Sequence, residues 1–152
     1  MNSSNIMTTM ETLRDALSSM TAITFDDGLV DDWLEYYNGQ VYTCKIGMEP
    51  NITPDDYPLI RIVPSSTTDS GTIGLQTTEV LIYFGTPIQP FDDTPDSSGR
   101  VRMEKLYAAL LTMEKAIRYQ LDATGGLYQQ TIFDEDRLDT YKLMAIRAQL
   151  QG

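Results

Sequence analysis

The chain has 152 residues, of which 41% are hydrophobic, so we expect one globular domain, residues 1–152, with a single core. The lack of histidine and the single cysteine, Cys44, argue against acid–base catalysis by histidine, an internal disulfide and a metal site, so no catalytic residue or cofactor is predicted. The net charge of −11 disfavours binding to nucleic acid phosphates, and we expect neither a secretory signal nor a membrane helix, which needs roughly 20 apolar residues.

The first part of the chain is predicted to form one helix. Thr8 and Glu11 have the spacing of a capping box, in which each side chain binds the free backbone N–H of the other residue. Apolar residues then recur at the spacing of one helix face: Met10, Leu13, Ala16, Leu17 and Met20. We therefore expect a flexible tail over residues 1–7 and a helix over 9–20. Residues 25–39 mix apolar, aromatic and acidic side chains, and the pattern fits either a short helix or a loop.

Three strands are predicted between residues 41 and 84. Residues 41–46 and 59–63 are rich in β-formers, and Pro64 is expected to end the second strand because proline cannot donate to a sheet ladder. Residues 65–74 are rich in Ser, Thr and Gly and are expected to form an exposed loop. The third strand, residues 77–84, is the most apolar of the three.

One long helix is predicted next. Ser98 is a favourable N-cap, and the pair Gly125 and Gly126 is typical of a helix end, where a left-handed residue is needed. Glu114 and Arg118 are spaced for an ion pair on the solvent side of this helix. Apolar residues between the two ends alternate by three and four positions: Met103, Leu106, Leu110, Met113, Ile117 and Leu121, with Tyr107 and Leu111 beside them.

The C-terminal part is predicted to hold a short strand over residues 127–133 and a last strand over 140–150. A helix is the alternative for the last segment, because its Leu, Met, Ala, Arg and Gln residues are good helix formers. The expected fold class is α/β, meaning a mixture of helices and strands, and within it the α+β type, because the sheet is mostly antiparallel. It consists of a small, mostly antiparallel sheet of four to five strands, packed by the N-terminal helix and the long helix, with main elements in the order α-β-β-β-α-β.

Carboxylates gather in two clusters within predicted turns. Neither cluster has the order of oxygens and glycine that a calcium loop requires, so we expect solvated turns and predict no metal site. Cys44 is interpreted as a small apolar residue of a strand, because no histidine exists to activate its thiol. The first acidic cluster is Asp26, Asp27, Asp31 and Asp32, and the second is Asp92, Asp93 and Asp96.

Basic residues gather at the start of the predicted long helix, where positive charge opposes the helix dipole. They are Arg100, Arg102 and Lys105. They form either a solvated surface or a contact with an acidic neighbour, and an acidic chain can supply that neighbour as a second copy of itself.

Two stretches and the order of elements carry a resemblance to a known family. Residues 57–64 (Tyr-Pro-Leu-Ile-Arg-Ile-Val-Pro) place a proline before the second strand, and residues 140–147 (Thr-Tyr-Lys-Leu-Met-Ala-Ile-Arg) form a closing strand. Residues 83–87 (Tyr-Phe-Gly-Thr-Pro) end the strand before the long helix. With the leading helix, this arrangement resembles the tail terminator, or tail-completion, proteins of long-tailed bacteriophages over most of the chain.

The resemblance implies a structural virion protein that is assembled in the host cytoplasm. Proteins of this family form a ring, expected to be a hexamer, that caps the tail tube, stops its polymerisation and joins tail to head. The implied partners are further copies of the chain, the tail tube protein and a neck or head-completion protein, while DNA passes through without specific binding. In such a ring we expect an interface at Arg100, Arg102 and Lys105. The expected acidic channel lining, which would repel DNA, is Asp26, Asp27, Asp31 and Asp32.

Three other functions compete with this one. A phage neck or connector protein of related fold fits the same pattern. An acidic, non-enzymatic adaptor or inhibitor that binds a basic partner fits the net charge. A small enzyme acting through Asp26 and Asp31 fits least well, because paired catalytic carboxylates need burial to raise one pKa, and these residues lie among turn residues.

Overall fold

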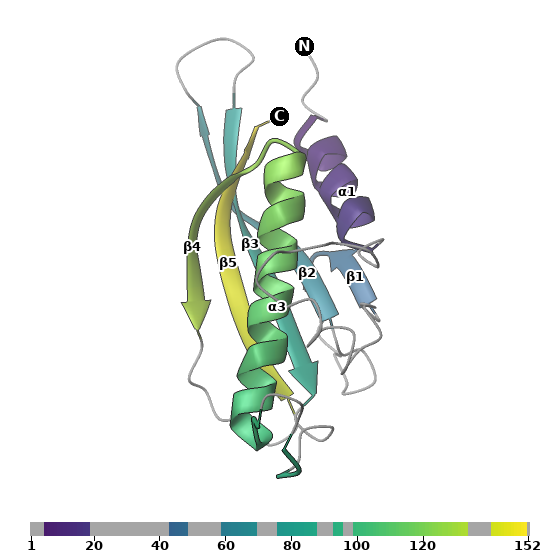
Figure 1. The fold of residues 1–152 in the computed structure, drawn as a ribbon. Helices are drawn as coiled ribbons and strands as arrows, with labels where there is room; N and C mark the ends of the chain where they lie inside the picture. Colours follow the sequence, from purple (N-terminus) through teal and green to yellow (C-terminus); the bar gives the residue numbers. More distant parts are fainter. Residues whose placement is uncertain are drawn as a thin grey trace.

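The computed structural model describes residues 5–18, 43–48, 59–69, 76–87, 93–95, 99–133 and 141–151. Within these ranges the chain forms an α+β fold with two helices and a five-stranded mixed sheet (Figure 1), which confirms the predicted fold class. The elements, in chain order, are α1 (Asn5–Ser18), β1 (Thr43–Ile46), β2 (Leu59–Asp69), β3 (Gln76–Pro87), α3 (Arg102–Ala123), β4 (Leu127–Phe133) and β5 (Tyr141–Gln151). No helix in the described ranges is long and apolar enough to span a membrane.

The strand order across the sheet is β1-β2-β3-β5-β4. Among the described strands, only β1 and β2 run parallel, and the other three pairs are antiparallel. The last strand, β5, is therefore a central strand, and its register places Ile146 beside Ile82 of β3. The alternative of a helix over residues 140–150 is wrong, because alternate residues of this segment face the core with the two-residue period of a strand.

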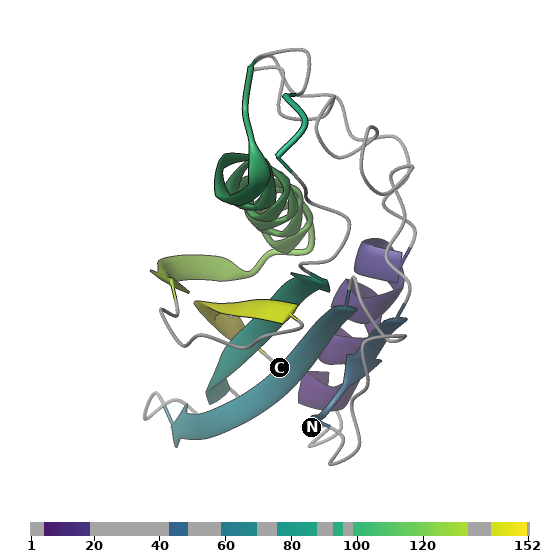
Figure 2. The ribbon, with the colours of Figure 1, turned by 90° about the horizontal axis from the view of Figure 1, so that it is seen from below.

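Both helices lie on one side of the sheet (Figures 1 and 2), where they contact each other. We call this side of the sheet the helix face and the opposite side the far face. Helix α1 contacts β1, β2 and β5, whereas α3 contacts β3 and β4. The strand residues buried on the helix face are Ile60, Ile62, Val80, Ile82, Phe84, Met144, Ile146, Ala148 and Leu150. The hydrophobic core that the described residues form therefore lies between the helices and this face.

Helix α3 buries the stripe that its sequence predicts. Leu106, Leu110, Met113, Ile117 and Leu121 are fully buried, but Met103 is 44% exposed and does not join them. The helix begins at Arg102 and its N-cap position is Val101, so the expected start at Ser98 is wrong. Valine has no side-chain acceptor, and Glu104 Oε1 instead accepts a hydrogen bond from the Val101 N–H at 3.4 Å. The predicted ion pair of Glu114 and Arg118 is confirmed at 3.2 Å, but the expected solvent position is wrong for Glu114, which is only 12% exposed because it faces Thr131 of β4.

Two further predicted boundaries are wrong. Helix α1 begins at Asn5 rather than near residue 9, so residues 5–7 are not part of a flexible tail. Thr8 lies inside the helix, where its carbonyl accepts a hydrogen bond from Thr12 Oγ1. The capping box with Glu11 therefore does not form the helix start. Strand β2 continues through Pro64 to Asp69, because the register with β3 shifts there and a bulge accommodates the missing N–H. The segment 25–39 lies outside the described residues.

Candidate protein-binding surface

The three predicted interface cations do not form one exposed surface. Lys105 is only 5% exposed, and its Nζ donates to the Thr94 carbonyl at 2.8 Å, so the expected exposed position is wrong. Arg102 is exposed and lies 3.8 Å from Asp93, in an ion pair whose side chains are 56% and 82% exposed. Solvent screening leaves such a pair little stabilising effect. Arg100 is half-buried beside the helix start. An interface role for this group stays a prediction, carried by Arg100 and Arg102.

The predicted channel-lining residues lie outside the described part of the chain. Asp26, Asp27, Asp31 and Asp32 all do. Of the second acidic cluster, Asp92 and Asp96 also lie outside the described residues, whereas Asp93 is described and exposed. Among the described residues, no group of carboxylates, cysteines or histidines could hold a metal ion.

Charge is distributed unevenly between the described ranges and the rest of the sequence. All basic residues except Arg137 fall within the described ranges, against a minority of the 22 acidic residues. The acidic residues within these ranges are Glu11, Asp15, Asp69, Glu79, Asp93, Glu104, Glu114 and Asp122. The described body is therefore slightly basic, although the whole chain is strongly acidic.

Cys44 is half-buried on β1 and points toward α1, where its Sγ donates to the Arg14 carbonyl at 3.6 Å. Burial raises the pKa of this thiol above its ordinary value, and a hydrogen bond with Ser18 and the nearby guanidinium groups oppose that rise only in part. A thiol whose pKa is raised is a poor nucleophile at neutral pH. This agrees with a packing role for Cys44.

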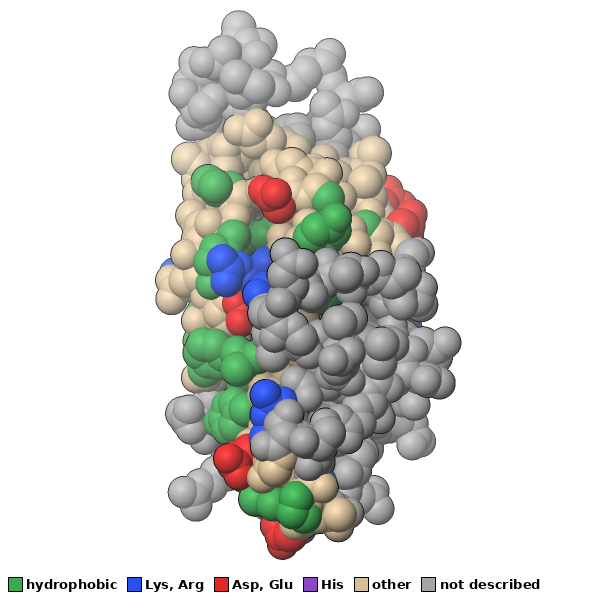
Figure 3. All heavy atoms as spheres, viewed as in Figure 1, with side chains coloured by type: hydrophobic (Ala, Val, Ile, Leu, Met, Phe, Trp, Pro, Cys, Tyr) green, Lys and Arg blue, Asp and Glu red, His purple; other side chains and the backbone are tan. Residues whose placement is uncertain are grey.

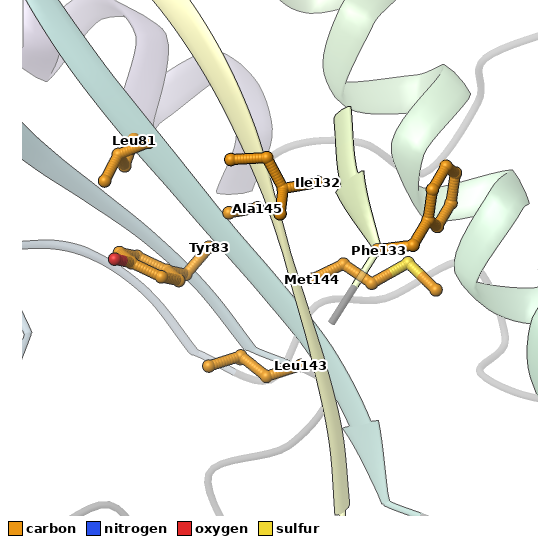
Figure 4. A pocket seen from close by; sticks show the side chains of 7 residues that line it. All are labelled: Leu81, Tyr83, Ile132, Phe133, Leu143, Met144 and Ala145. Atoms are coloured by element: carbon orange, nitrogen blue, oxygen red, sulfur yellow. The ribbon is translucent and has the colours of Figure 1, made fainter. Parts of the chain in front are cut away.

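The most distinctive surface of the described protein is an apolar patch on the far face (Figure 4). It consists of Leu81, Tyr83, Ile132, Leu143 and Ala145, which come from β3, β4 and β5. The register sets Ala145 between Tyr83 on one side and Ile132 on the other. The small alanine between two large side chains leaves a hollow of about 280 Å³.

The lining of this hollow suits an apolar partner. Phe133 and Met144, whose side chains belong to the helix face, reach its margin, and the Tyr83 hydroxyl is the single polar side-chain group among the lining residues. Ligand pockets usually combine an apolar wall with several converging polar groups, and those are missing from this lining. The hollow therefore fits an apolar side chain of another protein better than a substrate.

A polar row borders the patch along the same strands. Arg147 of β5 lies 3.3 Å from Glu79 of β3, and its Nη1 donates to Gln130 Oε1 of β4 at 3.2 Å. The Arg147 side chain is 41% exposed and the Glu79 side chain 33%. Because solvent screens a pair this exposed, it orients the two side chains more than it stabilises the fold. An apolar centre with a polar border is the usual composition of a protein interface.

Strand β4 forms one edge of the sheet beside this patch (Figure 1) and pairs, among the described strands, only with β5. It has no charged residue and no proline. Three of its apolar side chains are exposed: Leu127 by 60%, Ile132 by 36% and Phe133 by 45%. On the helix face, hydrophobic side chains also follow the margin where β4 and α3 lie (Figure 3).

Four side chains on the helix face hold β4 against α3, and we call them the brace. Thr131 Oγ1 donates to Glu114 Oε1 at 3.1 Å, Glu114 pairs with Arg118, and Arg118 lies over the Tyr128 ring at 4.0 Å from its centroid. Tyr128 closes the cycle, since its hydroxyl is 2.8 Å from Thr131 Oγ1. The brace joins the edge strand to α3, and we expect it to keep β4 ordered.

The turn into β4 depends on two glycines. Gly125 has a φ of +85°, a left-handed conformation that side chains disfavour. A Cβ on Gly126 would collide with Leu121 and lie 3.0 Å from Leu150 Cδ2. The predicted glycine end of α3 is therefore confirmed, and it also aligns β4 directly after the helix.

Sequence reasoning did not identify the patch or the edge. In residues 140–150 the pattern was used only to choose between strand and helix. The signal for the patch was that Leu143 and Ala145, which alternate with the core residues Met144 and Ile146, are also apolar. The signal for the edge was the uncharged run 127–133. The chain matches no protein-family model and no curated protein.

Proposed function

We propose that this protein is a structural assembly subunit without enzymatic activity, which associates with further copies of itself and acts as a phage tail terminator. The observation that carries the proposal is the apolar patch on the far face, next to an uncharged edge strand. Burying apolar surface is the main favourable term in association, whereas a monomer gains nothing from exposing it. The order of elements, with a long helix between β3 and the closing strands, adds support through its resemblance to tail terminators.

In this role the subunits form a ring that caps the tail tube, meets a neck or head-completion protein, and lets DNA pass. A ring needs a contact in which one surface of each subunit meets a different surface of the next. The patch supplies one such surface. The large excess of acidic residues outside the described ranges agrees with a ring that does not retain DNA.

The first test is the mass of the full chain in solution, measured by light scattering and native mass spectrometry over a wide concentration range. A hexameric ring has six times the subunit mass of 17.1 kDa. A strictly monomeric protein, both alone and on tails, would contradict the proposal and favour the adaptor alternative.

The second test places charge in the patch. Leu81→Lys puts an ammonium group where a partner must remove water, so we expect association to weaken by about tenfold or more. Leu111→Lys is the matched control, because Leu111 is 36% exposed on α3, away from the far face. Ala145→Leu is a second variant that fills the hollow without adding charge and should block an inserted side chain. Equal association of all three variants would exclude the patch as the contact.

The tail role needs a separate assay. Purified protein mixed with the tail tube protein of the same virus should stop tube growth, and electron microscopy would then show tubes of limited length. Tubes that lengthen equally with and without the protein would contradict a terminator and favour another neck role.

A further inference from the structure

We infer that β4 is a docking edge for a second copy of this chain: its outer backbone edge accepts an extended segment of the neighbouring subunit, which continues the sheet across the subunit boundary. The inference rests on the proposed function and names the part of the subunit that makes the contact. Backbone pairing at a sheet edge is a general mode of protein recognition, in which the main chain supplies hydrogen bonds and the side chains supply specificity.

The two edges of the sheet differ in how they are protected. β1 is four residues long and carries Lys45, which is exposed. Short length and an exposed lysine are two ways in which proteins keep a sheet edge from pairing with another chain. β4 is seven residues long and has neither protection. About half of its N–H and C=O groups point away from β5, as in any edge strand.

Strand β4 is also ordered by contacts with the rest of the described protein. The brace fixes β4 on the helix face, and the hydrogen bond from Arg147 to Gln130 fixes it on the far face. Gly125 and Gly126 set its start. Ordering a strand on binding costs conformational entropy, and an edge that is already ordered avoids that cost.

Charge and position favour a second copy as the occupant. The exposed charge of the brace is positive, because Arg118 is 49% exposed and Glu114 only 12%. Most of the acidic residues of a second copy lie outside the described ranges, and an acidic segment of that copy complements a positive margin. Ile132 belongs to both β4 and the apolar patch, so one neighbour can pair with the edge and cover the patch in a single contact.

Amide hydrogen exchange of the full chain tests the inference directly. The measurement compares dilute monomer with protein at a concentration where the mass shows the assembly. We expect the outward amides of residues 127–133 to exchange at least about tenfold more slowly in the assembly, because they gain partners. An assembly whose β4 amides exchange as fast as in the monomer overturns the edge inference and leaves the proposed function standing. A chain that never assembles overturns both.

A variant with a lysine on β4 gives a second test of the inference. Gln129→Lys adds charge at the extra residue of the β4 bulge, which is exposed and has no register partner on β5. We expect association to weaken by about tenfold or more, with an unchanged denaturant midpoint. The matched control is Met7→Lys, because Met7 is 45% exposed on α1 and far along the chain from β4. Association of Gln129→Lys equal to that of the control overturns the inference.

Discussion

The helix face and the far face of the sheet are formed by alternate residues of the same strands, and they differ in how deeply those residues are buried. On the helix face, Met144 and Ile146 of β5 are at most 1% exposed and belong to one core cluster with residues of α1 and α3. On the far face, Leu143 and Arg147 of the same strand are partly exposed and border a hollow. The helix face therefore carries most of the buried apolar surface of the described residues, whereas the far face keeps apolar side chains that are partly exposed. We therefore expect a substitution on the helix face to change the free energy of unfolding, and a substitution on the far face to change the proposed association.

Truncating a buried leucine of α3 should have the largest effect on stability. Leu110→Ala removes a fully buried side chain, so we expect a loss of about 2–5 kcal/mol in the free energy of unfolding. Leu81→Ala on the far face should cost about 1 kcal/mol or less, because its side chain is already partly hydrated. Urea denaturation of both variants measures the difference, and similar losses would mean that the faces do not differ.

A methyl group at the turn into β4 should have the next largest effect. Gly126→Ala crowds Leu121 and Leu150, both fully buried, so we expect a loss of about 1–3 kcal/mol. Adding Leu150→Val should relieve part of the crowding, so the two losses should not add. Calorimetry or denaturant titration measures this coupling, and full additivity would contradict crowding as the cause.

Breaking the brace should have a moderate effect. Thr131→Val keeps the shape of the side chain but removes the donor to Glu114 and the partner of the Tyr128 hydroxyl, for a loss of about 0.5–1.5 kcal/mol. Thr68→Val, at an exposed position of β2, is the control and should be nearly neutral. If β4 amides exchange no faster in Thr131→Val than in the control, the brace does not order the strand.

The smallest effect concerns pH and Cys44. Burial raises the pKa of this thiol, so the unfolded chain, whose cysteine pKa lies near 9.0, releases its proton first as the pH rises. Below that pH the thiol makes no pH-dependent contribution, and above it the stability should fall by at most about 1.4 kcal/mol per pH unit until the folded-state pKa is passed. Comparing the protein with Cys44→Ala at pH 8 and pH 10 isolates this contribution, and identical slopes would contradict the raised pKa.

Periodic patterns predicted the fold well. The stripe of Leu106, Leu110, Met113 and Ile117 and the alternation of residues 140–150 each reflect one element buried against a large surface, so local sequence contains the signal. Element boundaries followed the sequence less closely. β2 passes Pro64 because β3 lies beside it, and Ser65 Oγ donates across the bulge to the Glu79 carbonyl at 3.1 Å. That partner lies too far along the chain for a local pattern to reveal it.

The candidate site was harder to predict for the same reason. The sequence pattern suggests that Lys105 is a surface cation, yet its side chain is buried and its Nζ donates a hydrogen bond to the Thr94 carbonyl. Arg61 is fully buried within β2 and donates to the Ile60 carbonyl at 3.0 Å, which no hydropathy pattern suggests. The hollow arises where Tyr83, Ala145 and Ile132 meet from three strands. Only the sheet register brings them together.

The central position of β5 has a consequence for synthesis on the ribosome. β3 lacks one of its two neighbours until residues 141–151 have emerged, and the hydrogen bond from Thr9 Oγ1 to the Gln151 carbonyl joins positions 142 residues apart. Non-local pairing of this kind slows folding and exposes apolar strands in the nascent chain. The sheet therefore cannot be completed before residues 141–151 have emerged, and β3 exposes apolar side chains to chaperones until then.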